Sequence, residues 1–168
     1  MKKWFWRVLL AVGFLALGVW VWTLVFPTPE RVIRKRLIEL AKCATVKGNE
    51  APLAVLLNSQ KLGGFFTADA EISLDVPGRP QQVLSGRDNL IQASMQFRPA
   101  VGSLQVEFYD IIVTVAPDKT TAEANLTLVA RLAGERDKVV QELKLRMNKA
   151  EGTWQIYRLE TVKTLSLL

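Results

Sequence analysis

The chain has 168 residues, a length that fits one domain plus a short additional segment. Hydrophobic residues make up 49% and charged residues 23% of the sequence, a composition that excludes a disordered, collagen-like or low-complexity protein. Histidine is absent and Cys43 is the single cysteine, which excludes intrachain disulfides, Cys/His zinc sites and Ser-His or Cys-His nucleophile pairs. We expect neither a metal nor a cofactor.

The N-terminal segment has the pattern of a membrane anchor. Residues 8–26 form an uncharged run in which Thr23 is the only conventionally polar residue. As a helix rising about 1.5 Å per residue, this run would span roughly 28 Å, close to the hydrocarbon thickness of a bilayer. Tryptophans flank it where interfacial aromatic belts lie, namely Trp4, Trp6, Trp20 and Trp22. We therefore expect a basic flank and transmembrane signal anchor over residues 1–26 and one domain over residues 27–168.

A cleaved signal peptide is the alternative, because the run follows the basic residues Lys2, Lys3 and Arg7. Cleavage at the small-x-small site in residues 16–18 would leave an apolar tail on the mature chain, which favours an uncleaved anchor. The cationic N-terminal tail favours a cytoplasmic N-terminus, whereas the basic residues that follow the run favour the opposite orientation. We expect a single-pass protein of the inner (cytoplasmic) membrane with an extracytoplasmic C-terminal domain.

The segment after the anchor predicts an amphipathic helix that starts at Thr28-Pro29. Apolar residues recur on one face of it, at Ile33, Leu37, Leu40, Ala41 and Ala44. Basic residues lie on the other side, at Arg31, Arg34, Lys35 and Lys42. This basic side is either simply solvated or in contact with anionic lipid headgroups. Without the N-terminal flank, 19 basic and 16 acidic residues remain, and they form no basic cluster interleaved with aromatics, so we expect no nucleic-acid partner.

The rest of the chain predicts two more helices and six strands. The helices cover residues 49–62, with Asn49 as the N-cap, and a segment that opens with a capping box at residues 85–88 and ends before Pro99. The strands are expected at residues 70–76, 82–84, 104–115, 122–132, 139–147 and 154–165. In the strand 104–115 the apolar parity changes in the middle, which predicts a β-bulge at Tyr109-Asp110.

Three short segments resemble the nuclear transport factor 2-like superfamily, also called SnoaL-like. They are Phe-Phe-Thr-Ala-Asp-Ala at 65–70, Ser-Gly-Arg-Asp-Asn-Leu-Ile at 85–91 and Gly-Thr-Trp-Gln-Ile at 152–156. The resemblance implies an α+β fold, a cone-shaped, curved antiparallel sheet packed on helices around a cavity. The superfamily contains isomerases, dehydratases, hydrolases and cyclases as well as noncatalytic members, so the fold does not fix the function. Its enzymes place Asp, His or Tyr inside the cone, and this chain has no histidine.

Catalytic candidates are few. Tyr109 and Asp110, at the expected bulge, could serve a steroid-isomerase-like site as acid and base. Tyr157, Glu160 and Asp69 are further residues that could contribute. The alternative, which we favour, is that Tyr109 packs its ring and Asp110 lies on the surface. The acidic residues Asp69, Glu71 and Asp75 fit a solvated strand edge better than a metal site, and Cys43 fits a small core residue better than a reactive thiol.

The expected function is binding or assembly. Glu142, Lys144 and Arg146 share one face of their strand, which is either a solvated sheet face or a polar interface with a protein partner or a second copy. An anchor followed by such a cone is similar to scaffold proteins of type IV secretion systems and to membrane proteins of lipid-import complexes. We expect a noncatalytic, membrane-anchored scaffold domain of the bacterial cell envelope. The alternative is a membrane-tethered binder of a small apolar ligand, or an isomerase- or hydrolase-like enzyme, that uses the cone cavity.

Overall fold

The computed structural model describes residues 28–74, 82–134 and 138–162. The expected anchor over residues 1–26, with Trp4, Trp6, Trp20 and Trp22, lies outside this part of the chain. Among the helices that the structure does describe, none combines the length and hydropathy needed to cross a bilayer.

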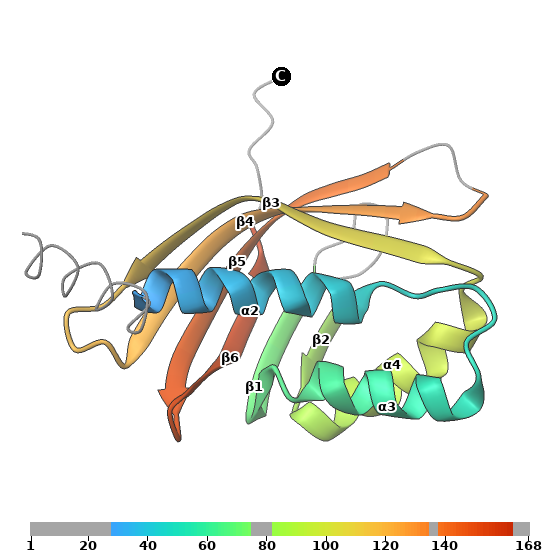
Figure 1. The fold of residues 1–168 in the computed structure, drawn as a ribbon, viewed down its shortest axis with the longest axis horizontal. Helices are drawn as coiled ribbons and strands as arrows, with labels where there is room; N and C mark the ends of the chain where they lie inside the picture. The colour runs from blue at the N-terminus through green and yellow to red at the C-terminus, as the bar shows by residue number, and fades with distance from the viewer. Residues whose placement is uncertain (1–27, 75–81, 135–137, 163–168) are drawn as a thin grey trace, which may run out of the picture.

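A curved, mixed sheet of six strands is the framework of the domain (Figure 1). Its strand order is β2-β1-β6-β5-β4-β3. The strands are β1 (Phe66–Leu74), β2 (Gln82–Ser85), β3 (Leu104–Val115), β4 (Thr121–Leu132), β5 (Lys138–Ala150) and β6 (Thr153–Thr161). Neighbouring strands are antiparallel except β1 and β6, which run parallel, so the expectation of a purely antiparallel sheet is wrong at this one pairing.

Three helices cover one side of the sheet: α2 (Pro29–Ala44), α3 (Pro52–Gly63) and α4 (Arg87–Ala100). The helix α2 crosses in front of the long strands, while α3 and α4 pack on each other beside β1 and β2 (Figure 1). Four of the apolar residues that predicted the inner face of α2 are buried, namely Ile33, Leu37, Leu40 and Ala41. The helices therefore wrap the concave side of the sheet, as the predicted α+β class requires.

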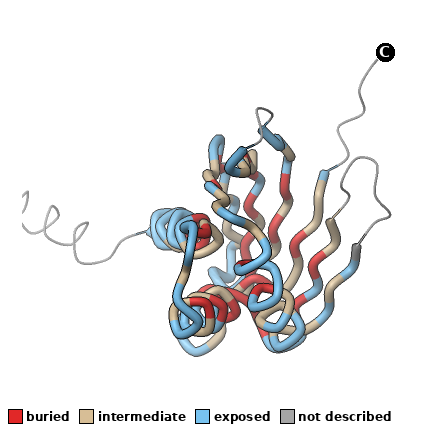
Figure 2. Tube along the Cα trace, turned by 90° about the vertical axis from the view of Figure 1, so that its right-hand side faces the viewer, coloured by how far each residue is buried: buried red, intermediate tan, exposed pale blue. Residues whose placement is uncertain are grey.

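The core lies between the helices and the inner face of the sheet. Along β4 the side chains of Ala122, Ala124 and Leu126 are buried and alternate with more exposed polar residues. Figure 2 shows the same alternation of buried and exposed positions along the neighbouring strands. Trp154 and Ile156 on β6 continue this layer, with 3% and 0% exposure. The alternation is the period-2 pattern that predicted these strands.

The expected bulge in β3 is confirmed. The register between β3 and β4 shifts between Tyr109 and Ile112, and Asp110 has a φ of 50°. An aspartate enters this left-handed region at lower cost than most residues. Before the bulge the even-numbered Val106 is buried, and after it the odd-numbered Ile111 is buried. This switch is the parity change seen in the sequence.

Helix α4 differs from its prediction at both ends. Its N-cap is Gly86, with a φ of 90° and no side-chain cap, so the predicted capping box is wrong. Instead, Asn89 Nδ2 donates to the Ser85 carbonyl at 2.7 Å. The helix also continues through Pro99, because proline removes only one amide donor, and the Val101 amide still reaches the Phe97 carbonyl at 3.1 Å.

The N-termini of α3 and β1 also differ from their predictions. The N-cap of α3 is Ala51, since Asn49 adopts a φ of 59° in the preceding turn. Strand β1 starts at Phe66, four residues before the predicted start at Ala70, because Phe66 pairs with Ile156 on β6. That pairing joins segments ninety residues apart in the sequence.

Candidate functional site

An apolar pocket of about 600 Å³ lies at the end of the sheet that α3 and α4 cover. Apolar side chains of six elements and the segment after α2 line it, namely Ala44, Val46, Leu62, Ile72, Leu74, Val83, Leu84, Leu90, Ala93, Phe97 and Leu104. Ser94 and Arg98 are its polar lining residues. Its size falls within the range of roughly 300–1,000 Å³ that is usual for small-molecule sites.

Helical spacing on α4 builds much of the pocket wall. Leu90, Ala93, Ser94 and Phe97 follow one another at intervals of three and one residues, which places them on one face of the helix. Phe97 is 50% exposed although it lines the pocket, and Val83 on β2 is 58% exposed. These two side chains therefore mark the opening of the pocket toward solvent.

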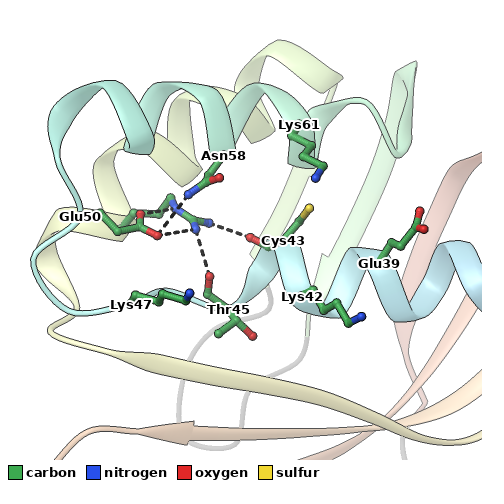
Figure 3. A pocket seen from close by; sticks show the side chains of 9 residues that line it. Glu39, Lys42, Cys43, Thr45, Lys47, Glu50, Asn58 and Lys61 are labelled. Carbon is green, nitrogen blue, oxygen red and sulfur yellow. Dashed lines mark hydrogen bonds and ion pairs between the residues drawn. The ribbon is translucent and has the colours of Figure 1, made fainter.

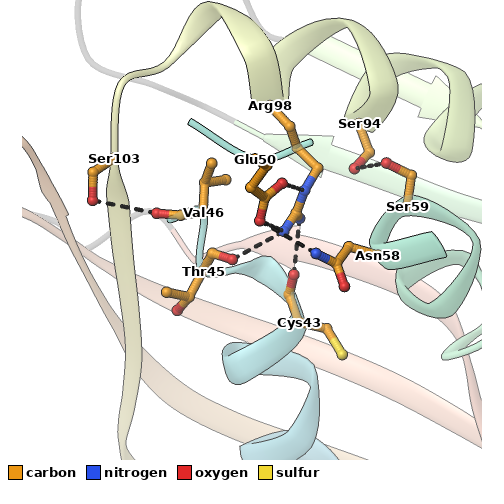
Figure 4. A network of polar contacts seen from close by, with 9 residues as sticks. All are labelled: Cys43, Thr45, Val46, Glu50, Asn58, Ser59, Ser94, Arg98 and Ser103. Carbon is orange, nitrogen blue, oxygen red and sulfur yellow. Dashed lines mark hydrogen bonds and ion pairs between the residues drawn. The ribbon is translucent and has the colours of Figure 1, made fainter. Parts of the chain in front are cut away.

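Two buried hydroxyls lie beside the pocket. Ser59 on α3 and Ser94 on α4 approach to 3.0 Å between their Oγ atoms (Figure 4). Ser59 is 0% exposed and Ser94 is 8% exposed. Their mutual hydrogen bond uses one hydroxyl proton, so a second proton remains for another acceptor. Because Ser94 also lines the pocket, it could donate to a single polar atom of a bound molecule.

Arg98 closes the polar end of the pocket with all three of its guanidinium nitrogens engaged (Figure 4). Nε and Nη2 donate to Glu50 at 2.9 and 3.0 Å. Nη1 donates to the Cys43 carbonyl at 2.9 Å, and Nη2 also donates to the Thr45 carbonyl at 3.0 Å. These carbonyls belong to the C-terminal end of α2, where a cation is favoured by the helix dipole.

The buried ion pair of Arg98 and Glu50 has a structural role. The side chains of Arg98 and Glu50 are only 3% and 9% exposed. The hydrogen bonds from Arg98 lower the pKa of the Glu50 carboxyl, so it stays ionised. Among the described residues that line the apolar pocket, Arg98 is the one charged group, and four of its five N–H donors are used by Glu50 and two backbone carbonyls. The pocket wall thus offers hydrophobic contact and one hydroxyl rather than an acid or a base.

The predicted catalytic residues lie outside the apolar pocket. Tyr109 is 47% exposed, and its hydroxyl donates to Glu107 Oε2 at 2.6 Å. This hydrogen bond raises the pKa of the Tyr109 phenol. Asp110 is exposed at the bulge. None of the other three residues considered for catalysis lines the pocket either, namely Tyr157, Glu160 and Asp69.

The predicted sheet-interface residues lie together on β5, and two of them, Lys144 and Arg146, have charged partners within the sheet. Lys144 Nζ is 2.9 Å from Glu123 Oε1 on β4, and Arg146 Nε is 3.8 Å from Glu123 Oε2. The hydrogen bond from Lys144 lowers the pKa of Glu123. Glu142 is exposed on the same strand. These contacts lie within the sheet itself, and the use of this face as an interface stays a prediction.

The remaining sequence candidates are also placed. Arg31, Arg34 and Lys35 are exposed on α2, and Arg34 Nη2 donates to the Ile111 carbonyl at 2.6 Å. Cys43 is half-buried and packs against the core, as predicted. In the ranges that the structure describes, no three acidic or sulfur ligands gather as a metal site would need. Asp75 lies outside those ranges.

Sequence reasoning missed the residues that shape the pocket. Glu50 and Arg98 are 48 positions apart, and Ser59 and Ser94 are 35 apart. The residues next to each of them in the sequence do not indicate which residue it contacts. Arg98 precedes Pro99, a position that is typical of the end of a helix. A spacing-based search could have found only the apolar face of α4.

Comparison with known proteins identifies the architecture. No family model and no curated protein matches the chain. Among solved structures, a nuclear transport factor 2-like protein of unknown function from Pseudomonas putida is similar, with a TM-score of 0.60, 10% identity and coverage of 82% of this chain and 88% of that one. The domain has a nuclear transport factor 2-like fold.

Two proteins from Novosphingobium aromaticivorans agree with this nuclear transport factor 2-like assignment. One is a candidate scytalone dehydratase, with a TM-score of 0.60 and 17% identity over 80% of this chain and 83% of that one. The other is a nuclear transport factor 2-like protein with a cystatin-like fold, with a TM-score of 0.55 and 19% identity over 80% and 83% of the two chains. At such low identity these likenesses show the fold alone.

Proposed function

We propose that this protein is a membrane-anchored domain that binds a small, largely apolar molecule in its cone pocket without transforming it. The observation that carries the proposal is the pocket itself, about 600 Å³ of space lined almost entirely by apolar side chains. Burying such a ligand releases water from both surfaces, at roughly 25 cal/mol for each Å² of apolar area. Ser94 can orient one polar atom of the ligand.

The absence of acid–base groups at the wall supports binding over catalysis. Proton transfer requires a group within hydrogen-bond reach of the reacting atom. Tyr109 and Asp110 do not line the pocket, and the described lining contains no carboxylate. The guanidinium of Arg98 is held by Glu50 and two backbone carbonyls. The isomerase- or hydrolase-like alternative would need a group that reaches this pocket from elsewhere.

The expected anchor would place this binding domain at the inner membrane. The apolar run of residues 8–26 and its flanking tryptophans support a single transmembrane helix, and the cationic N-terminal tail supports a domain on the extracytoplasmic side of the inner membrane. Tethering would raise the concentration of the binding domain near the bilayer. Apolar ligands also concentrate there, so a pocket of this kind would be well placed to exchange them with the membrane.

An assembly role is the second candidate, carried by the charged outer face of the sheet. A protein partner or a second copy of the chain would contact this face at Lys144, Arg146 and Glu142. Lys144 and Arg146 already pair with glutamates of the sheet, so they do not need a protein partner to balance their charge. The open apolar pocket is therefore the stronger argument, and it favours ligand binding. Charge reversal at the three positions would break an assembly but leave ligand binding intact.

A neutral, environment-sensitive naphthylamine dye tests the binding proposal on the full-length protein in detergent. Ala93→Trp places an indole in the pocket, whereas Met95→Trp changes a neighbouring residue of α4 that does not line it. Saturable dye binding by the wild type and by Met95→Trp, together with about tenfold or greater loss in Ala93→Trp, is the expected result; a loss of about 1.4 kcal/mol is tenfold. Equal binding by all three proteins would reject the pocket as the site.

A further inference from the structure

A second hollow, of about 310 Å³, lies between the C-terminal half of α2 and the helix α3 (Figure 3). Its lining shares only Arg98 with the apolar pocket. Three lysines from three segments surround it: Lys42 on α2, Lys47 in the following loop and Lys61 on α3. In Figure 3 they lie on different sides of the opening, with Cys43 between them.

The amino groups of these lysines are not neutralised by the protein. Within the described part of the chain, no ion pair joins Lys42, Lys47 or Lys61 to a carboxylate. Glu50 lines the hollow but is occupied, because Arg98 contacts both of its oxygens and Asn58 Nδ2 donates to it at 3.2 Å. Glu39, which also interacts with Arg36, is thus the one acidic side chain left in the lining to offset three positive charges.

The outer face of the sheet shows the opposite arrangement. There Lys144, Arg146 and Arg158 are each within 4.0 Å of at least one glutamate. The same division appears in the sequence, where residues 28–64 contain seven basic and three acidic residues and residues 65–168 contain 12 and 13. The uncompensated positive charge of the domain is therefore concentrated on the side formed by α2 and α3.

We infer that this hollow is a binding site for a phosphate-bearing anion. A lysine ammonium is a compact charge with three donors, and three of them around one opening suit a multiply charged group with several oxygens. The group could belong to a soluble phosphate compound or to a lipid headgroup. Arg31 and Lys35 lie on the same side of α2 as Lys42 by helical spacing, with Glu39 between Lys35 and Lys42, so further positive charge lies toward the N-terminal end of the helix.

Calorimetric titration of the full-length protein with pyrophosphate, in neutral detergent, tests the site. The double variant Lys47→Gln/Lys61→Gln removes two charges at the hollow. The control Lys138→Gln/Lys149→Gln removes two exposed charges from β5, away from it. We expect binding about tenfold weaker in the first variant, as for the loss of a charged hydrogen bond, and changed less than about twofold in the control.

A second arm identifies the source of the phosphate. Neutral detergent micelles doped with phosphatidic acid are compared with micelles doped with phosphatidylcholine, and the same variants are used. Preference for phosphatidic acid that is lost only in Lys47→Gln/Lys61→Gln supports the site with a headgroup as its ligand. Lysine-dependent binding of pyrophosphate without that preference supports the site with a soluble ligand.

The inference is overturned if neither probe binds in the millimolar range, or if both double variants weaken binding equally, which would mean attraction to net charge alone. Matching thermal unfolding midpoints show that the variants are folded. Dye binding in the apolar pocket is measured on the same samples. We expect dye binding to be unchanged by Lys47→Gln/Lys61→Gln, so the anion-site inference and the apolar-pocket proposal are tested independently.

Discussion

Arg98 of α4 and Glu50 of the loop before α3 form a buried, bidentate ion pair, with contacts of 2.9 and 3.0 Å and side-chain exposures of 3% and 9%. The same guanidinium caps the C-terminal end of α2 by donating hydrogen bonds to the Cys43 and Thr45 carbonyls. One side chain therefore joins α4 to the C-terminal end of α2 and to the loop that leads into α3. This joint fixes the distance between α2 and α4, and with it the shape of the apolar wall.

Removal of Arg98 is expected to be strongly destabilising. Arg98→Met would leave the Glu50 carboxylate buried without its partner and two α2 carbonyls uncapped, at a cost of about 3 kcal/mol. Urea denaturation followed by circular dichroism measures the loss. Arg131→Met is the control, because the Arg131–Glu107 pair is 4.0 Å long and 54% and 37% exposed, and its loss should cost less than about 1 kcal/mol. Equal losses in both variants would contradict the assigned role.

The same pair predicts an acid-sensitive stability. The pKa of Glu50 in the folded state is lowered, first by its hydrogen bond from Arg98, so the unfolded state takes up its proton more readily than the folded state. The stabilisation is complete above the ordinary value of 4.5 and is lost as the pH falls through the folded pKa. Glu50→Gln should flatten the dependence of the unfolding free energy on pH in that window. Because the pair is buried, the difference should persist in high salt.

Ser59 and Ser94 are expected to act as a unit. Ser94→Ala would leave the Ser59 hydroxyl fully buried without its partner and cost about 1–3 kcal/mol. The double variant Ser59→Ala/Ser94→Ala removes both hydroxyls and should recover most of that loss. A double-mutant cycle from denaturation curves gives the coupling. Additive effects of the two substitutions would show that the hydroxyls do not depend on each other.

The close approach of α3 and α4 depends on Gly63. A Cβ at this position would lie 2.5 Å from Ile91 Cγ1 and 2.6 Å from Ile91 Cδ1. Gly63→Ala should therefore destabilise the domain by roughly 1–3 kcal/mol through overpacking. Ile91→Ala in the Gly63→Ala background should recover part of this loss, although the same change alone in the wild type is destabilising. Thermal unfolding of the four proteins checks this reversal of sign.

Substitutions at the bulge are expected to leave ligand binding unchanged. Tyr109→Phe removes a hydroxyl that bonds only to Glu107 among the described residues, and Asp110→Asn keeps a side chain that tolerates the φ of 50°. Neither side chain lines the apolar pocket. Dye titration of both variants should give the wild-type affinity. Loss of binding with retained folding would favour the enzyme alternative.

The sequence predicts a strand of this domain well where apolar and polar residues alternate within the strand itself. The bounds of β3 and the bulge at Asp110 follow from alternation and its change of parity. The parallel pairing of β1 with β6 could not be derived in this way, because it depends on Phe66 meeting Ile156 across most of the chain. Local propensity also failed at Pro99, where the last helical turn forms despite the missing amide.

The candidate site was less accessible from the sequence than the fold. Leu90, Ala93 and Phe97 show helical spacing, but spacing alone does not distinguish a pocket wall from a packed core. The partners of Arg98 and Ser94 lie on other elements, so their burial could be known only from the assembled fold. The three unpaired lysines of the second hollow likewise come together only when α2 and α3 are side by side.

Methyl-detected NMR on the full-length protein in detergent tests the central claim most directly. A neutral naphthylamine dye is titrated into protein labelled at leucine methyls. We expect shift changes and dye–methyl contacts at the pocket leucines Leu62, Leu74, Leu84, Leu90 and Leu104. The exposed Leu53 and Leu57 of α3 and the core residue Leu145 of β5 should remain unchanged. Contacts confined to Leu53 and Leu57, or no contacts at all, would contradict an apolar ligand site inside the cone.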